Sequence, residues 1–212
     1  MVSKSTFSLV KLNNMKKLLS VIVLISIACA SFTSADDGIF AIVKTEKGEI
    51  TIRLHYDKAP MTVANFIGLA EGSIENSAKE KGAPFYDGLN FHRVEAGAII
   101  QGGCPIGNGL GNPGYKFKNE TPKSLNHDKA GVVAMANSGN NTNGSQFYIT
   151  MRPIPSLDGD YSVFGQVEKG LGVIEMISLG DKIINVRIER KGELAKAFEI
   201  NTAFPKKARK KL

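Results

Sequence analysis

Four short segments carry the side chains of this sequence that could do chemistry. Phe91-His92-Arg93-Val94 is soon followed by Gln101-Gly102-Gly103, and Met135-Ala136-Asn137 and Asn143-Gly144-Ser145-Gln146-Phe147-Tyr148 follow further along the chain. Together they supply one permanently charged guanidinium, several amide groups and a set of apolar side chains. They supply no nucleophile, no metal site and no phosphate cradle. The chemistry that such a set can do is narrow.

Two other kinds of site are disfavoured by residue spacing. His55, His92 and His127 are scattered without the spacing of metal ligands, so neither a metal site nor a cofactor is expected. Gly109-Leu110-Gly111-Asn112-Pro113-Gly114 fits the dinucleotide-binding pattern G-x-G-x-x-G. That pattern must follow a strand and open a helix, and the next residues, Tyr115 to Lys118, have no helical period. The glycines indicate a tight surface loop instead.

The four segments resemble the active face of cyclophilin-type peptidyl-prolyl cis-trans isomerases. The similarity extends from about Ile39 to Arg190 and is most specific at residues 91–103, 135–150 and 157–167. Members of this family rotate X-Pro peptide bonds, whose barrier of about 18 to 20 kcal/mol comes from amide conjugation. The resemblance implies this activity without a cofactor. It also implies unfolded or partly folded proline-containing polypeptides as partners, and no nucleic acid.

Arg93 is the candidate catalytic residue. In the twisted transition state the prolyl nitrogen gains a lone pair, and a fixed hydrogen-bond donor there stabilises the transition state more than the planar ground states. A guanidinium is such a donor at any ordinary pH, and no proton transfer is required. An arginine beside a strand could instead form a surface salt bridge. The substrate contacts implied by the resemblance are His92, Ala98, Ile99, Gln101, Ala136, Asn137, Gln146, Tyr148, Leu157 and Tyr161.

The resemblance assigns an apolar pocket for the proline ring to Ile99, Tyr148 and Leu157, with Ala98 at its edge. Gln101 and the backbone around Asn137 should hold the flanking peptide groups. The family commonly has a phenylalanine where this chain has Ala98, so a shallower pocket, or one rebuilt by its neighbours, is expected. A non-catalytic proline-peptide binding module or holdase on the same scaffold is therefore a second hypothesis.

Two further departures concern a drug rather than the substrate. Ser156 and Tyr161 stand where many eukaryotic members have a cyclosporin-contacting tryptophan and a histidine. Weak cyclosporin binding is therefore expected.

The pattern of apolar residues predicts a mainly β fold. Ile39 to His55 should form a hairpin, and Val63 to Ala70 recur at helical spacing until Gly72. A polar surface loop at 72–86, several short strands with glycine-rich connections and a second helix from Val173 to Leu179 follow. This predicts a closed or nearly closed antiparallel β-barrel. The resemblance makes it a closed eight-stranded barrel capped by two α-helices.

Residues 1–35 are typical of a secretory signal peptide, with Met15 as an alternative start of translation. Two lysines precede an apolar run, residues 18–30, and small residues then lead to Ala35. The run is too short for a good membrane span. Cleavage after Ala35 is favoured over lipidation of Cys29. We therefore expect a periplasmic protein that binds a membrane only if lipidated at Cys29.

The expected domain covers residues 36–204, followed by a basic tail at 205–212. The whole chain has a formal net charge of +7, but the excess of cations lies in the signal peptide and in the five lysines and arginines of the tail. We expect the tail to be a solvated, disordered end, with attraction to anionic membranes or nucleic acid as the alternative. Cys104, alone after processing, is interpreted as structural, and a monomer is expected.

Overall fold

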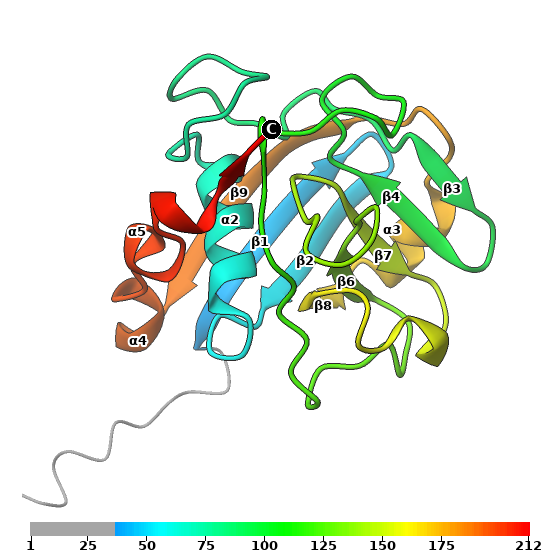
Figure 1. Ribbon diagram of the computed structural model, residues 1–212. Helices are drawn as coiled ribbons and strands as arrows, with labels where there is room; N and C mark the ends of the chain where they lie inside the picture. The colour runs from blue at the N-terminus through cyan, green and yellow to red at the C-terminus, as the bar shows by residue number, and fades with distance from the viewer. Residues whose placement is uncertain (1–36) are drawn as a thin grey trace, which may run out of the picture. The chain divides into compact units, whose positions relative to one another are not determined.

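A curled, eight-stranded antiparallel sheet organises residues 37–212, the part of the chain that this computed structural model describes (Figure 1). The predicted signal peptide, Met15 and Cys29 lie outside the described residues. The strands pair in the order β3-β4-β7-β6-β8-β2-β1-β9. Their bounds are β1 Gly38–Thr45, β2 Gly48–Leu54, β3 Arg93–Glu95, β4 Ile99–Gly102, β6 Val132–Met135, β7 Phe147–Thr150, β8 Val163–Lys169 and β9 Ile183–Lys191. The prediction of a mainly β fold is confirmed.

The sheet does not close into a complete barrel, which corrects the expectation of a closed one. β3 and β9 are its two edges, and within residues 37–212 no strand ladder joins them. β3 is only three residues long, so the contact is made by the segment that precedes it. Gly88 N–H donates to the Ile183 carbonyl at 2.9 Å, and Ile183 N–H donates to the Leu89 carbonyl at 2.8 Å. These hydrogen bonds hold the edges together without continuous strand pairing.

The predicted N-terminal hairpin is confirmed by the pairing of β1 with β2. Ile39 lies opposite Leu54 and Thr45 opposite Gly48. Ile50, Ile52 and Leu54 are buried as their alternation predicts. They face the main core.

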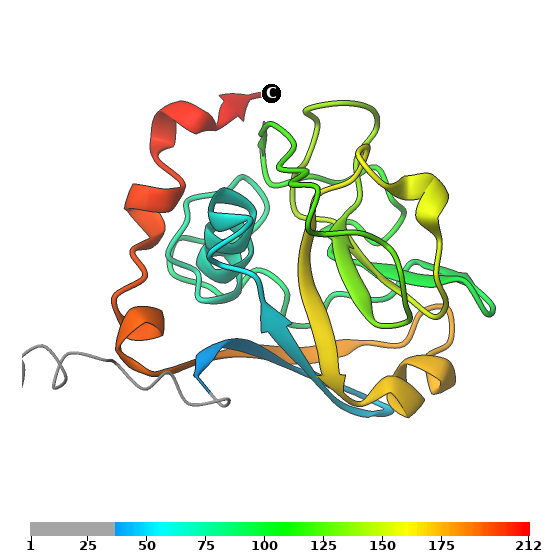
Figure 2. The same cartoon turned by 90° about the horizontal axis from the view of Figure 1, so that it is seen from below.

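Helix α2, Pro60–Ala70, covers the concave face of the sheet (Figure 2). It begins earlier than the predicted helix, with Pro60 in the first turn, where proline lacks only an N–H that would be unpaired anyway. Glu120 accepts hydrogen bonds from the backbone N–H groups of Met61 at 3.2 Å and Thr62 at 2.6 Å. A carboxylate from a distant loop thus satisfies the helix N-terminus.

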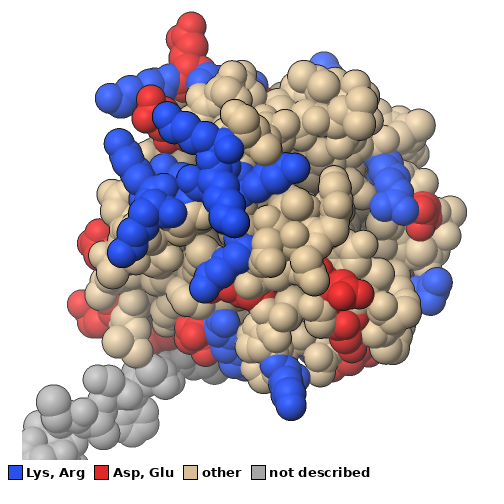
Figure 3. All heavy atoms as spheres, viewed as in Figure 1, with Lys and Arg blue, Asp and Glu red and all other residues tan. Residues whose placement is uncertain are grey.

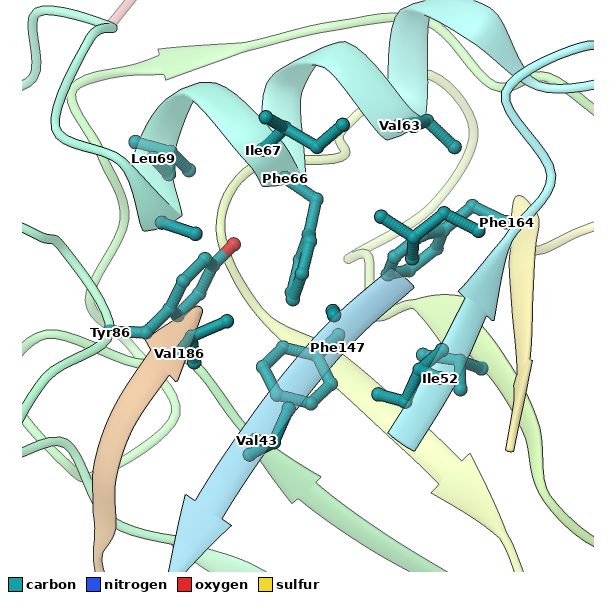
Figure 4. Packing of buried hydrophobic residues seen from close by; sticks show 14 of the residues in the cluster. Val43, Ile52, Val63, Phe66, Ile67, Leu69, Tyr86, Phe147, Phe164 and Val186 are labelled. Carbon is teal, nitrogen blue, oxygen red and sulfur yellow. The ribbon is translucent and has the colours of Figure 1, made fainter. Parts of the chain in front are cut away.

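Aromatic side chains fill the space between α2 and the sheet (Figure 4). The ring of Phe66, on α2, stacks on Tyr86 with centroids 4.9 Å apart. It also contacts Phe164 of β8 at 5.3 Å and Phe147 of β7 at 5.6 Å. All four side chains are fully buried. The core therefore ties α2 to the strand that carries Tyr148.

The second predicted helix is present but shorter, as α3, Leu171–Met176. The remaining elements were not predicted. They are α4 Glu193–Lys196, α5 Ile200–Ala203, the 3-10 helices η1 Pro155–Leu157 and η2 Lys206–Ala208, and the short strands β5 Tyr115–Lys116 and β10 Lys210–Lys211. The elements from α4 to β10 run beside α2 (Figure 2).

The lysines of the basic tail are exposed, as predicted for a solvated end, but the tail pairs with β5 instead of being disordered. Lys210 pairs with Lys116 and Lys211 with Tyr115, so β10 adds to β5 as a two-stranded sheet. The preceding Phe204 is fully buried and packs on Phe117, with ring centroids 5.1 Å apart. The apolar anchor lies just before the cations, in a segment where the sequence has no regular period.

Candidate active site

A cavity of about 290 Å³ lies where β3, β4 and β7 meet the connections around β6 and η1. Its floor is a small apolar cluster in which Ile99 packs with Tyr148, and Leu157 and Tyr161 lie against them. The lining residues are Arg93, Glu95, Ala98, Ile99, Gln101, Ala136, Asn137, Tyr148, Arg152, Ile154, Leu157 and Tyr161. The structure thus brings the predicted site residues together, apart from His92 and Gln146, which lie beside Gln101.

Arg93 lies at this cavity because β3 and β4 pair with Arg93 opposite Gln101. Its Nη1 donates to Gln101 Oε1 at 3.0 Å, and its Nη2 forms an ion pair with Glu95. The side chain is 51% exposed, so the charge remains accessible from the cavity mouth. The two interpretations of Arg93 are therefore compatible, since the same guanidinium forms a surface ion pair and lines the cavity.

Gln101 connects Arg93 to a second glutamine. Its Nε2 donates to Gln146 Oε1 at 3.0 Å. Gln146 Nε2 in turn donates to the carbonyl oxygens of Gly109 at 2.7 Å and Gly111 at 2.9 Å. Both amide groups are oriented by these partners, because carbonyl oxygens accept only from the NH₂ end. This chain of hydrogen bonds holds the guanidinium in a fixed position.

The G-x-G-x-x-G segment has a structural task in this arrangement. It forms a loop that leads into β5 and not into a helix, so the context of a dinucleotide site is absent from it. The Cys104 thiol, fully buried, accepts from the N–H groups of Gly109 at 3.2 Å and Gly111 at 3.3 Å. Although burial raises the pKa of Cys104, backbone hydrogen bonds from Ile106, Gly111 and two residues between them lower it overall. The Cys104 thiol therefore fixes the same loop, residues 109–111, to which Gln146 donates its hydrogen bonds.

His92 lies behind the cavity wall. Its Nε2 is 3.1 Å from Gln146 Oε1, where it donates if that nitrogen carries the proton. Burial lowers the pKa of His92, and the nearby Arg93 charge lowers it as well. The imidazole is therefore neutral at physiological pH and supports the glutamine without acting as an acid.

Two tyrosines form the aromatic wall of the cavity. The Tyr148 and Tyr161 rings meet edge to face with centroids 5.7 Å apart. The Tyr148 hydroxyl is 2.8 Å from His127 Nε2, and His127 Nδ1 is 2.8 Å from Asp158 Oδ1. Burial raises the pKa of Tyr148 far above its ordinary value, so the hydroxyl stays neutral. These aromatic rings supply bulk that Ala98 lacks.

Replacing Tyr148 by phenylalanine should destabilise the protein by about 1 to 3 kcal/mol, because the fully buried His127 loses a partner. The free energy of unfolding in denaturant measures this. Tyr161→Phe is the matched control, since its hydroxyl makes no hydrogen bond within residues 37–212. It should change stability by less than about 0.5 kcal/mol. Equal losses in the two variants would contradict the assignment.

Sequence reasoning missed five residues of this region. Glu95, Arg152 and Ile154 line the cavity, and His127 with Asp158 supports Tyr148 from behind. Glu95 could have been found, because it lies two residues after Arg93 on a predicted strand and so shares its face. The others come from separate loops without local pattern. Within the described part of the chain, no group of three or more His, Cys, Asp and Glu residues is placed to hold a metal ion.

Comparison with known proteins decides the family. The family model described as "Cyclophilin type peptidyl-prolyl cis-trans isomerase/CLD" matches residues 40–199. The chain belongs to the cyclophilin-type peptidyl-prolyl cis-trans isomerases. A peptidyl-prolyl cis-trans isomerase of Helicobacter pylori is 43% identical to this cyclophilin over 149 residues, 69% of this chain and 85% of the relative. Peptidyl-prolyl cis-trans isomerase A of Mycobacterium tuberculosis is 47% identical over 144 residues, 65% and 79% of the two chains.

Solved structures agree with this assignment. A cyclophilin-type isomerase of Cryptosporidium parvum superposes with a TM-score of 0.63 at 28% identity, covering 72% of this chain and 98% of the other. A crystal structure of that protein in the presence of the dipeptide Ala-Pro gives a TM-score of 0.59 at 27% identity, with 73% and 99% covered. Among residues 37–212 of this cyclophilin, none of the helices is long and apolar enough to cross a membrane.

Proposed function

We propose that this isomerase twists X-Pro bonds by donating a hydrogen bond from Arg93 to the prolyl nitrogen, and that it assists the folding of exported proteins. The observation that carries the first part is the position of Arg93. Its guanidinium is held by Gln101 at the mouth of a cavity whose floor is apolar. A proline ring on that floor would bring its nitrogen close to the charged donor.

The remaining cavity residues complete the proposed mechanism. Ile99, Tyr148 and Leu157 hold the ring by excluding water from it. Gln101 and the backbone near Asn137 hold the flanking peptide groups. The transition state gains a lone pair at nitrogen that the planar amide lacks, so the Arg93 hydrogen bond lowers the barrier without a proton transfer. The chemistry needs no base, and neutral His92 fits a supporting role.

The test is cis/trans exchange of an Ala-Pro test peptide measured by NMR with and without the protein. Accelerated exchange with saturation at high peptide concentration supports the proposal. Peptide binding without acceleration would instead favour a binding module or holdase. Ala98 would then be the first position to examine, with alanine replaced by phenylalanine to restore the pocket wall common in the family.

The exchange rate should be nearly independent of pH above the ordinary histidine value of 6.5, because guanidinium does not titrate there. Since burial lowers the folded-state pKa of His92, the proton binds only below that value, where it places a second cation beside Arg93. The rate should fall there, and a His92→Gln variant should remove the fall. A rate that rises with pH between 7 and 9 would indicate a base instead.

The same depressed pKa affects stability. The folded state resists protonation of His92 more than the unfolded chain does, so the unfolded state binds more protons as the pH falls. The stabilisation that neutral His92 contributes is fully present above its unfolded-state pKa of 6.5. It is lost as the pH falls from there through the lower folded-state pKa of His92. Unfolding followed at several pH values in wild type and His92→Gln separates this contribution from the carboxylates.

The proposal of export rests on residues 1–35, with a charged start, an apolar run and small residues. Mass spectrometry of the mature N-terminus tests it, because a chain beginning at Asp36 and one acylated at Cys29 differ greatly in mass. An unprocessed N-terminus would contradict export. We also propose a monomer in solution, for which size-exclusion chromatography with light scattering is the measurement.

A further inference from the structure

The last residues of the chain border a groove that is continuous with the candidate active site. This groove has a volume of about 360 Å³, and its lining includes Leu212 and Lys116. Leu212 N–H donates to the Gly114 carbonyl at 3.3 Å, directly after β10 pairs with β5. Residues 206–212, here called the C-terminal segment, therefore lie at one wall of the groove.

The groove and the Arg93 cavity share Gln101, Ala136 and Asn137 in their linings. A polypeptide with its proline in the cavity can thus continue into the groove. An extended chain advances about 3.3 Å per residue, so residues a few positions from the proline come next to the C-terminal segment. Side chains at those positions would meet the surface that this segment presents.

That surface is cationic. Lys206, Lys207, Lys210 and Lys211 are exposed, and Lys116 of β5 lies opposite Lys210. No carboxylate of residues 37–212 lies within 4.0 Å of any of these five ammonium groups. Figure 3 shows the Lys and Arg side chains gathered on the face where Figure 1 places α5 and β10. Lys206 and Lys211 line a neighbouring hollow, whose lining also includes Glu75.

The segment is anchored by contacts that do not use the lysine charges. The Arg209 guanidinium lies 4.9 Å from the Phe204 ring centroid and 6.0 Å from that of Tyr115, and its Nη2 donates to the Phe204 carbonyl at 3.0 Å. Backbone pairing fixes Lys210 and Lys211. The backbone of the segment is thereby fixed, while the ammonium groups on their flexible side chains remain available to another molecule.

We propose that the C-terminal segment selects clients with acidic residues a few positions from the proline. The occupant is a polypeptide and not a membrane, because the cations adjoin a groove that leads into the peptide-binding cavity. Anionic side chains in the groove would replace the missing carboxylate partners. The inference rests on the proposed binding of proline at Arg93, and its test separates the two.

The test compares kcat/KM for three test peptides at low and high salt. Each contains Ala-Pro, with three glutamates before the proline, three glutamates after it, or glutamines in their place. We expect kcat/KM for one of the two acidic peptides to exceed that for the glutamine peptide. The expected factor is roughly two- to fivefold for each glutamate–lysine pair formed, as for exposed ion pairs. This preference should weaken in high salt because exposed charges are screened.

The variant is the full chain with Lys206, Lys210 and Lys211 replaced by glutamine. Its matched control replaces the exposed Lys44, Lys169 and Lys182, which lie outside the C-terminal segment and line neither the groove nor the hollow beside Lys211. The measured quantity is the ratio of kcat/KM for the acidic peptide to kcat/KM for the glutamine peptide. This ratio should approach one in the variant and stay at the wild-type value in the control. An equal ratio in both proteins, or no preference in wild type, would overturn the inference. No turnover of the glutamine peptide by wild type would overturn the proposed function instead.

Anionic lipid vesicles test whether the lysines bind a membrane surface instead of a polypeptide. Vesicles with phosphatidylserine should compete with the acidic peptide only weakly. Tight, tail-dependent vesicle binding in a wild-type protein that shows no preference among the peptides would assign the lysines to a membrane surface and refute the proposal.

Discussion

Replacing Arg93 by alanine should reduce the acceleration of Ala-Pro exchange by about 100-fold or more, as does removal of a single preorganised donor in other enzymes. The loss should appear mainly in kcat, because the hydrogen bond to the prolyl nitrogen strengthens only in the twisted state. The fold should remain intact, since Arg93 is half exposed and its ion pair with Glu95 lies at the surface. Exchange NMR with urea unfolding measures both effects.

The chain offers a close structural control for this variant. Arg187 pairs with Glu189 two residues later on a strand, as Arg93 pairs with Glu95, at a similar exposure of 60%. Arg187→Ala should leave exchange unchanged. Arg93→Lys should recover little activity, because an ammonium group lacks the rigid planar donors. If Arg93→Ala kept full activity, the acceleration would have to come from Gln101 or from the shape of the cavity alone.

The site could be predicted largely from short segments because its key pairs follow from strand pairing. Arg93 and Gln101 are separated by one tight hairpin, so residues close in sequence become opposite partners. A guanidinium and an amide side chain can bind and donate hydrogen bonds but cannot act as nucleophiles, so the residue types alone restrict the chemistry. The family resemblance supplied the remaining residues by position.

The contacts that sequence reasoning missed join distant loops. His127 and Asp158 are brought together only when η1 folds beneath Tyr148. Neither residue has a local pattern that separates it from an ordinary surface residue. Glu120 at the start of α2 is a similar case, because its carboxylate replaces a local cap.

Two expectations about the fold differ from the structure, each for its own physical reason. The count of strands was right, but a closed barrel requires its edges to pair, and β3 is too short to do so. The tail was expected to be disordered because its charge dominates its composition. Its position is instead fixed by Phe204, the buried ring before the charges, and by backbone hydrogen bonds that do not depend on side-chain type.

Replacing Phe66 by alanine should destabilise the protein by about 3 to 5 kcal/mol, the usual cost of truncating a buried phenylalanine. Its ring contacts Tyr86, Phe147 and Phe164, so the cavity left behind would lie between α2 and the sheet. Chemical unfolding measures the loss, and Leu179→Ala, at a side chain 70% exposed, should cost less than about 0.5 kcal/mol.

The consequence for activity distinguishes packing from catalysis. Phe147 precedes Tyr148 on β7, so loosening the ring cluster would displace the wall of the cavity before the chain unfolds. We expect Phe66→Ala to raise KM in its folded fraction, whereas Arg93→Ala lowers kcat. If Phe66→Ala lost only stability and kept the wild-type KM, the cavity wall would be fixed by β7 and its sheet neighbours alone, and α2 would serve the fold without positioning the site.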